Sequence, residues 1–185
     1  VNAEKDPIHP TIAYLEAACA VAKKRGLSTH LDGARLFNAA VALGGDPRTT
    51  ARAIAAPFDS VSVCFSKGLG APAGTMLVGT KDLIARAHRA RKMLGGGMRQ
   101  AGILAAAGLY ALEHHVERLA DDHANAKRLA AGLSEIRVLS VEAPPTNMVF
   151  ARIPAERCAA LQVHLRAHGV IALVHPRTRL VRHLD

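Results

Sequence analysis

The 185-residue sequence has no tryptophan, and aromatic residues make up only 3% of it. It therefore offers no aromatic platform on which nucleic-acid bases could stack. The 24 Lys+Arg against 15 Asp+Glu give a formal charge of +9, but these basic residues are spread over several predicted helices. No helix-turn-helix, zinc-finger or Lys/Arg block accompanies them. The composition argues against nucleic-acid binding despite the positive charge.

Cysteines and long apolar runs are also scarce. Cys19, Cys64 and Cys158 are too few and too scattered for a disulfide framework or a zinc site. We therefore predict no metal site and a reducing, cytoplasmic setting. The longest apolar run, from Ala101 to Leu112, is too short to span a bilayer, so no membrane association is expected.

The two ends of the sequence are unusual. It starts at Val1 without a signal-peptide pattern, and it stops at Asp185 directly after an apolar, strand-like run. We expect the sequence to be a piece of a longer protein, truncated at both ends.

The first two thirds of the sequence alternate between helical and strand patterns, which is typical of an α/β fold. Helices are predicted from His9-Pro10 to Gly26, over 36–43, 49–56 and 80–93, and over a long region 98–133 that bends near His114-His115. Strands are predicted over 27–31, 60–65 and 74–79.

The pattern changes near Ser134. Strands are predicted over 136–141, 147–153, 170–174 and 179–184, with one helix over 156–168. We therefore expect two domains: residues 1–133 as the C-terminal part of a large α/β domain, and residues 134–185 as a small, incomplete α+β domain.

Lys67 stands at the end of a predicted apolar strand, in a loop of small residues. A lysine desolvated at such a place can form an imine with a carbonyl compound. The alternative is a solvated lysine at a strand end, which the local sequence taken alone favours. A Walker phosphate loop is excluded because this lysine precedes its glycines, and the glycine spacing does not match a dinucleotide fingerprint either.

Asp32 ends another predicted strand, and it shares a strand face with His30. A carboxylate at the C-terminal end of a buried strand lies where α/β folds bind ligands. It needs a cationic partner, which could be Arg35 or a ligand's ring N–H⁺. The alternative is an Asp that caps a helix and forms a local salt bridge with Arg35. A metal site based on His30 and Asp32 has no third ligand at a suitable spacing.

The two segments together indicate one cofactor. An acid that holds a protonated pyridine nitrogen and a lysine that forms an imine are the two partners that pyridoxal phosphate needs. Asp32 and Lys67 both stand at C-terminal strand ends, about one strand–helix–strand unit apart.

Several motifs resemble those of the low-specificity L-threonine aldolases. The matching segments are HLDGARLFNAA at 30–40, FDSVSVCFSKGLGAP at 58–72 and RKMLGGGMRQAG at 91–102. The resemblance implies the aspartate-aminotransferase-like fold type I, whose large domain binds pyridoxal phosphate on a mostly parallel sheet with helices. It also implies a homodimer or homotetramer and a lyase that cleaves threonine and allo-threonine to glycine and acetaldehyde.

The resemblance further implies roles for residues around the cofactor. Lys67 would be the catalytic lysine that forms the imine, and Asp32 would pair with the pyridinium nitrogen. Ala34 would pack near the ring face. Arg35 would lie beside the ring hydroxyl and the substrate carboxylate.

Other implied roles concern the substrate and the subunit interface. Arg179 would bind the α-carboxylate of the amino-acid substrate, which an Arg fork can do bidentately. Lys92 and Arg99 would lie near a subunit interface. Without the resemblance, Arg179 would be interpreted as an exposed strand residue and Arg99 as a surface charge.

The resemblance implies that an N-terminal stretch of the aldolases supplies the phosphate-binding loop, and we expect that stretch to be missing from the residues given. We therefore expect the chain alone to bind pyridoxal phosphate weakly, to be inactive, and to expose apolar strand surface around Val61, Val63 and Met76. Two alternatives remain open: another lyase of the same fold that catalyses β-elimination, and a non-catalytic remnant.

Overall fold

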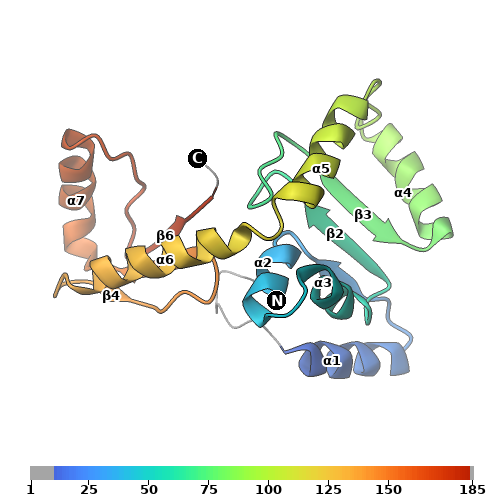
Figure 1. Ribbon diagram of the computed structural model, residues 1–185, viewed down its shortest axis with the longest axis horizontal. Helices are drawn as coiled ribbons and strands as arrows, with labels where there is room; N and C mark the ends of the chain where they lie inside the picture. Colours follow the sequence, from blue (N-terminus) through green and yellow to red (C-terminus); the bar gives the residue numbers. More distant parts are fainter. Residues whose placement is uncertain (1–10, 184–185) are drawn as a thin grey trace. The chain divides into compact units, whose positions relative to one another are not determined.

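The computed structural model describes residues 11–183, which form two compact units (Figure 1). The N-terminal unit comprises residues 11–120 and the C-terminal unit residues 121–183. These described residues contain seven helices and six strands, with one three-stranded sheet in each unit. The predicted helix start at His9-Pro10 and the predicted strand end at Leu184 lie outside the described residues.

The sheet of the N-terminal unit has the strand order β1-β2-β3. Strand β1 (His30–Asp32) runs parallel to β2 (Ser60–Cys64), and β2 pairs antiparallel with β3 (Thr75–Gly79). The parallel pair requires a crossover between its strands. That crossover contains α2 (Leu36–Leu43) and α3 (Pro47–Ala55).

Three further helices complete this unit: α1 (Ile12–Lys24), α4 (Lys81–Met93) and α5 (Gly102–His114). The predicted cap of α4 is confirmed, because the Thr80 side chain accepts a hydrogen bond from the Leu83 amide. Figure 1 shows α4 beside β3, with which it is in contact. None of the helices within residues 11–183 is long and apolar enough to cross a membrane.

The main core lies around β2. Val61 and Val63 are only 6% and 9% exposed, because their face of the strand is covered by apolar residues of α2, α3 and the segment that follows α5. The expectation that these two valines are exposed was therefore wrong. Met76 on β3 is 50% exposed, as predicted for that residue.

The β1 strand is shorter than predicted, and its start depends on β2. The Thr29 carbonyl accepts hydrogen bonds from the amides of Asp59 and Ser60, so the parallel pairing begins only at His30. The Asp59 carboxylate in turn accepts from the Thr29 amide at 2.7 Å and from the Thr29 hydroxyl at 2.8 Å. These bonds fix the two strands to each other at their amino ends.

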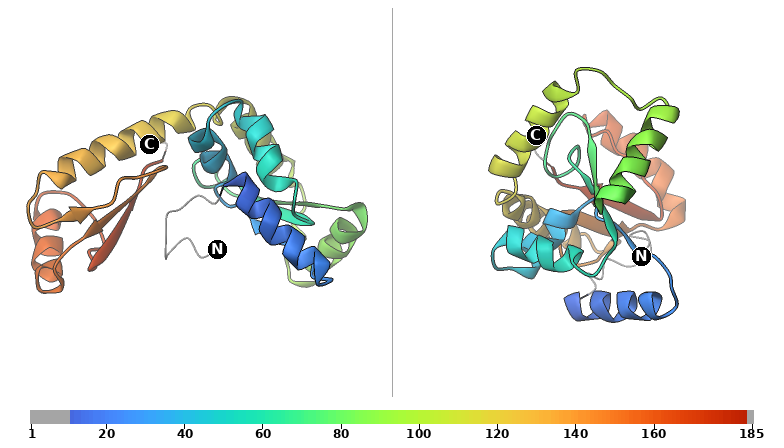
Figure 2. Two further views of the ribbon diagram at one scale, coloured as in Figure 1. Left: turned by 90° about the horizontal axis from the view of Figure 1, so that it is seen from below. Right: turned by 90° about the vertical axis from the view of Figure 1, so that its right-hand side faces the viewer.

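The C-terminal unit has an antiparallel sheet in the order β4-β5-β6. Its strands are β4 (Ser140–Val141), β5 (Met148–Arg152) and β6 (Arg177–Val181). Helix α6 (Leu119–Ser134) begins at the end of the N-terminal unit, and its apolar side chains pack on this sheet. Figure 2 shows the helix running along the strands of the sheet. Helix α7 (Ala155–Ala167) lies between β5 and β6 in the sequence.

Two features of this unit differ from the expectation. The chain divides before Asp121, whereas the sequence placed the domain boundary near Ser134, because α6 shares a core with the C-terminal sheet. The predicted strand over 170–174 does not form. Local bonds take donors of that segment instead: the Val170 amide donates to the Leu165 carbonyl near the end of α7, and the Val174 amide donates to the Gln162 side chain.

The bonds from Thr29 lower the pKa of Asp59 below its usual value of 3.8. The carboxylate therefore stabilises the folded state above that value, and its contribution is lost as the pH falls through the lowered pKa. We expect Asp59→Asn to lower the urea midpoint of unfolding more at about pH 7 than at about pH 2.5. The comparison uses urea titrations of both proteins at both pH values. An equal loss at both would show that the charge of Asp59 contributes nothing.

Candidate active site

The two motifs predicted to carry the chemistry meet at one edge of the N-terminal sheet. Asp32 is the last residue of β1, and Lys67 follows shortly after Cys64, the last residue of β2. Because the two strands are parallel, their carboxyl ends lie at the same edge. Residues of both motifs, among them Ala34, Arg35 and Gly68, also line one small cavity. The structure thus brings together the segments of Asp32, Ala34, Arg35 and Lys67.

Asp32 shapes the turn between β1 and α2. Its side chain is exposed, and its Oδ1 accepts a hydrogen bond from the Ala34 amide at 3.1 Å. The N-cap of α2 is Arg35 rather than Asp32. Asp32 therefore does not cap α2 in the described structure. Its carboxylate lies at the surface of the sheet edge.

Gly33 allows this turn to lie close to the neighbouring strand. A Cβ at this position would lie 2.8 Å from the Ser62 carbonyl oxygen and 3.2 Å from the Val61 side chain. Because the nearer atom belongs to the backbone of β2, the clash could be relieved only by moving one of the two strands. The glycine after Asp32 is thus required for close packing of the site.

Lys67 lies in a loop of residues 66–71, here called the lysine loop. The Gly70 amide donates to the Lys67 carbonyl at 2.8 Å, and the Ala71 amide donates to the Phe65 carbonyl at 2.9 Å. Lys67 is half-buried, while Gly68 and Leu69 after it are buried. The lysine therefore stands on an ordered loop whose next two residues are part of the interior.

Cys64 lies just before this loop. Partial burial raises the pKa of its thiol, but hydrogen bonds with Ser66 and Thr75 and the charge of Lys67 outweigh that effect. The pKa of Cys64 therefore lies below the usual thiol value. Cys19, Cys64 and Cys158 all lie within the described residues, and all three are free.

Two polar residues that the sequence analysis did not select also contact the lysine loop. Asn38 on α2 is only 3% exposed and lies against Gly68. His115, which follows α5, places its Nδ1 2.7 Å from the Leu69 carbonyl oxygen. A signal for Asn38 was present in the sequence, because it interrupts the otherwise apolar run of α2. No local pattern indicated the contact of His115.

The remaining predicted residues lie elsewhere. Arg179 is an exposed residue of β6 in the C-terminal unit, opposite Phe150 of β5. Lys92 is exposed in the last turn of α4, and Arg99 is exposed in the segment before α5. The roles assigned to these three residues stay predictions.

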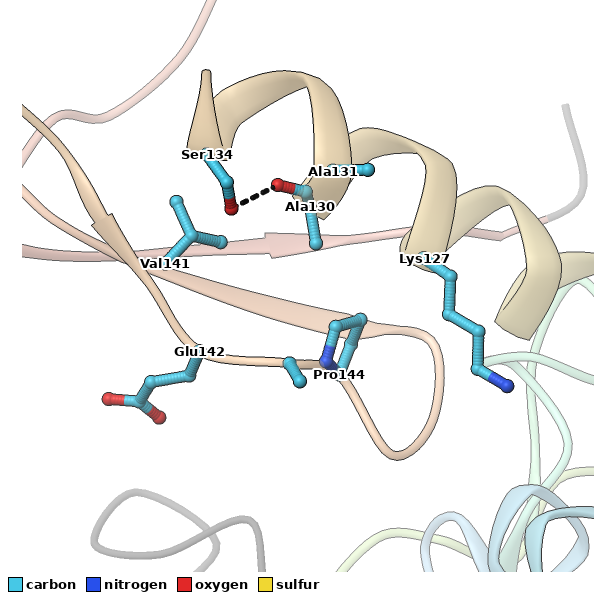
Figure 3. Close-up of a pocket in the computed structure, with 8 residues that line it drawn as sticks. Lys127, Ala130, Ala131, Ser134, Val141, Glu142 and Pro144 are labelled. Carbon is cyan, nitrogen blue, oxygen red and sulfur yellow. Dashed lines mark hydrogen bonds between the residues drawn. The ribbon is translucent and has the colours of Figure 1, made fainter. Parts of the chain in front are cut away.

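A larger hollow lies in the C-terminal unit, away from these motifs. It has a volume of about 360 Å³ and is lined by α6 and by the segment around Glu142. Figure 3 shows Lys127 and Glu142 on opposite sides of this hollow. The Ser134 hydroxyl donates a hydrogen bond to the Ala130 carbonyl at 2.8 Å. The residues that line it in the described chain include none of the predicted site residues.

The residues at the sheet edge fit two parts of pyridoxal phosphate. The Lys67 amine suits its aldehyde, and the exposed carboxylate of Asp32 suits its basic ring nitrogen. Residues 11–183 contain no group of three or more His, Cys, Asp or Glu side chains that could hold a metal ion.

The close approach at Gly33 leads to a prediction. We expect Gly33→Ala to destabilise the chain by about 1–3 kcal/mol, the usual cost of overpacking. Gly102→Ala is the matched control, because nothing lies within 4 Å of its Cβ position. The measurement is urea unfolding of both variants. Equal stability of the two variants would show that β1 and β2 are not held as closely as described.

Comparison with known proteins identifies the family. The sequence matches the beta-eliminating lyase family over residues 9–156. It is 48% identical over 172 residues to the low-specificity L-threonine aldolase of Escherichia coli K12, covering 93% of this chain and 50% of that protein. A probable low-specificity L-threonine aldolase 2 of Arabidopsis thaliana is 45% identical over 179 residues, with 93% and 49% covered. The chain spans about half the length of the curated relatives it matches.

Solved structures confirm the predicted fold class. A structure from Exiguobacterium sp. 255-15, assigned as an aromatic amino acid beta-eliminating lyase/threonine aldolase, superposes with a TM-score of 0.79 at 25% identity. The match covers 96% of this chain and 54% of that one. A structure from Listeria monocytogenes, assigned as an L-allo-threonine aldolase, shares the fold with a TM-score of 0.79 at 24% identity. The match covers 95% of this chain and 51% of that one. The resemblance inferred from the motifs is confirmed, and the chain belongs to the beta-eliminating lyase family.

Proposed function

We propose that this chain forms part of a pyridoxal phosphate-dependent aldolase that cleaves L-threonine and L-allo-threonine to glycine and acetaldehyde. The observation that carries the proposal is the parallel pairing of β1 with β2, which brings the Asp32 and Lys67 motifs to one sheet edge. The names of the relatives from Escherichia coli and Arabidopsis thaliana support the choice of substrate.

When bound, pyridoxal phosphate supplies an electron sink for the pair released at the substrate's α-carbon. In the proposal, Lys67 would hold the cofactor through its amine, and the ordered lysine loop directs that amine. The Asp32 carboxylate keeps a proton on the ring nitrogen. Its bond from the Ala34 amide orients the carboxylate, and the small side chain of Ala34 leaves room for the ring face.

Binding of the substrate is assigned to two arginines. Arg35 and Arg179 hold the α-carboxylate, for which a planar guanidinium with several donors is well suited. The reaction itself breaks the Cα–Cβ bond, removes the proton of the β-hydroxyl and returns a proton to Cα.

Phosphate binding is assigned to a part of the protein outside this chain. Anion sites of this kind use backbone amides at a helix start. The helix at the site, α2, instead begins with Arg35 and Leu36 directly after the Asp32 turn. The exposed Lys92 and Arg99 are assigned to a subunit interface of a homodimer or homotetramer, and we propose a cytoplasmic location.

A covalent test addresses the role of Lys67. The protein is incubated with pyridoxal phosphate, reduced with borohydride and digested, and the pyridoxyl group is located by mass spectrometry. We expect the label on Lys67 and its loss in Lys67→Arg, which keeps the charge but whose delocalised guanidinium does not act as a nucleophile. Lys81→Arg, on the exposed start of α4, is the matched control and should keep the label. Label recovered mainly on Lys81 or Lys92 would contradict the assignment.

A second candidate is a lyase of the same fold that catalyses β-elimination, which the family name itself includes. A substrate panel separates the two activities. With the complete protein of which this chain forms part, we expect threonine and allo-threonine to yield acetaldehyde and glycine in equal amounts, with little keto acid from serine or cysteine. Pyruvate and ammonia as the main products from serine or cysteine would favour the β-eliminating reaction instead.

A further inference from the structure

Asn38 is a buried polar residue that the proposed chemistry does not use. It lies on α2 between the buried residues Leu36 and Ala40, and only 3% of it is exposed. A core position of this kind normally carries an apolar residue, because burying an amide is costly unless it makes hydrogen bonds. The position of Asn38 therefore calls for a specific role.

Asn38 lies directly against the residue after Lys67. A Cβ on Gly68 would be 3.0 Å from Asn38 Oδ1 and 2.9 Å from Leu119 Cδ2. Gly68 has no positive φ angle, so its backbone conformation does not itself require glycine. The glycine at position 68 serves close packing: the backbone of the lysine loop rests on the Asn38 amide and on the fully buried Leu119.

His115 holds the next residue of the same loop. Its Nδ1 lies 2.7 Å from the Leu69 carbonyl oxygen, and because a carbonyl only accepts, Nδ1 carries the hydrogen. The Tyr110 ring contacts the His115 ring edge-on, with centroids 5.4 Å apart. Leu69 itself is only 4% exposed. The loop is thus anchored from α2 and from the end of α5 at two consecutive residues.

We propose that Asn38 and His115 are positioning residues that hold the lysine loop and thereby set the direction of the Lys67 amine. This inference rests on the proposed function of Lys67, because only a reactive lysine needs such positioning. Neither residue touches the reacting atoms in this assignment. Both act through the backbone of Gly68 and Leu69.

The first test measures the loop itself by hydrogen exchange of the full chain. The Gly70 and Ala71 amides, which close the loop, should exchange about three- to tenfold faster in His115→Ala, the effect of losing one hydrogen bond. Amides of β2 should not change. His115→Asn should restore protection, because the asparagine amide can donate from nearly the same place as Nδ1. His114→Ala is the matched control, since His114 is exposed.

The second test measures the lysine. Reductive trapping of pyridoxal phosphate on Lys67 should be several-fold slower in His115→Ala and Asn38→Ala, while trapping on the exposed Lys81 is unchanged. His115→Asn should recover the rate at Lys67. The trapping rate of Asn38→Ala counts only if the β2 amides of that variant keep their protection from hydrogen exchange. His115→Ala tests the inference without relying on Asn38→Ala.

The outcomes separate the two proposals. If the unaltered chain traps no cofactor on Lys67, the proposed function fails, whatever the exchange rates show. If Lys67 is trapped but its rate is the same in His115→Ala and Asn38→Ala, the positioning role is overturned and the proposed function stands. Unchanged exchange at Gly70 and Ala71 in His115→Ala would also overturn the inference.

Discussion

The parallel pairing of β1 with β2 is the constraint on which the candidate site depends. It aligns Asp32 with Ser62 and brings the carboxyl ends of both strands to one edge of the sheet. At their amino ends, Asp59 and Thr29 hold the strands together with side-chain and backbone bonds. At the other end, Gly33 lets the turn approach the backbone of β2. The segments of Asp32 and Lys67 thus lie at one sheet edge although the chain between them includes two helices and a strand.

The same strand pairing connects the lysine loop to the main core of the N-terminal unit. Val61 and Val63 of β2 are buried among the helices, so the strand is fixed in place up to the point where the lysine loop begins. Asn38 and His115 then continue that support to Gly68 and Leu69. A nucleophile must point at its target within a narrow range of directions. A rigid strand that ends in a supported loop can hold the nucleophile in such a direction. In this chain Lys67 extends from such a loop.

Most of the fold could be predicted from the sequence, and so could the positions of Asp32 and Lys67 near the ends of parallel strands, whereas their roles stay predictions. Helix α2 has the predicted bounds, since its apolar run ends at Gly44, and the Thr80 cap of α4 forms as expected. The strand over 170–174 failed because local bonds take donors at both of its ends: the Val170 amide donates to the Leu165 carbonyl, and the Val174 amide donates to the Gln162 side chain. The burial of Val61 and Val63 and the contacts of Asn38 and His115 depend on which helices cover β2. A linear pattern carries no information about that, so these features required the structure.

The most direct test of the account concerns the ring nitrogen of the bound cofactor. The holo form of the complete protein that contains this chain would be prepared with pyridoxal phosphate labelled with ¹⁵N in the ring, and the nitrogen shift would be followed by NMR. The account predicts a protonated nitrogen in the unaltered protein and a deprotonated one in Asp32→Asn, with the cofactor still attached to Lys67 in both. A nitrogen whose protonation is the same in the two proteins would contradict the claim that Asp32 and Lys67 act on one cofactor.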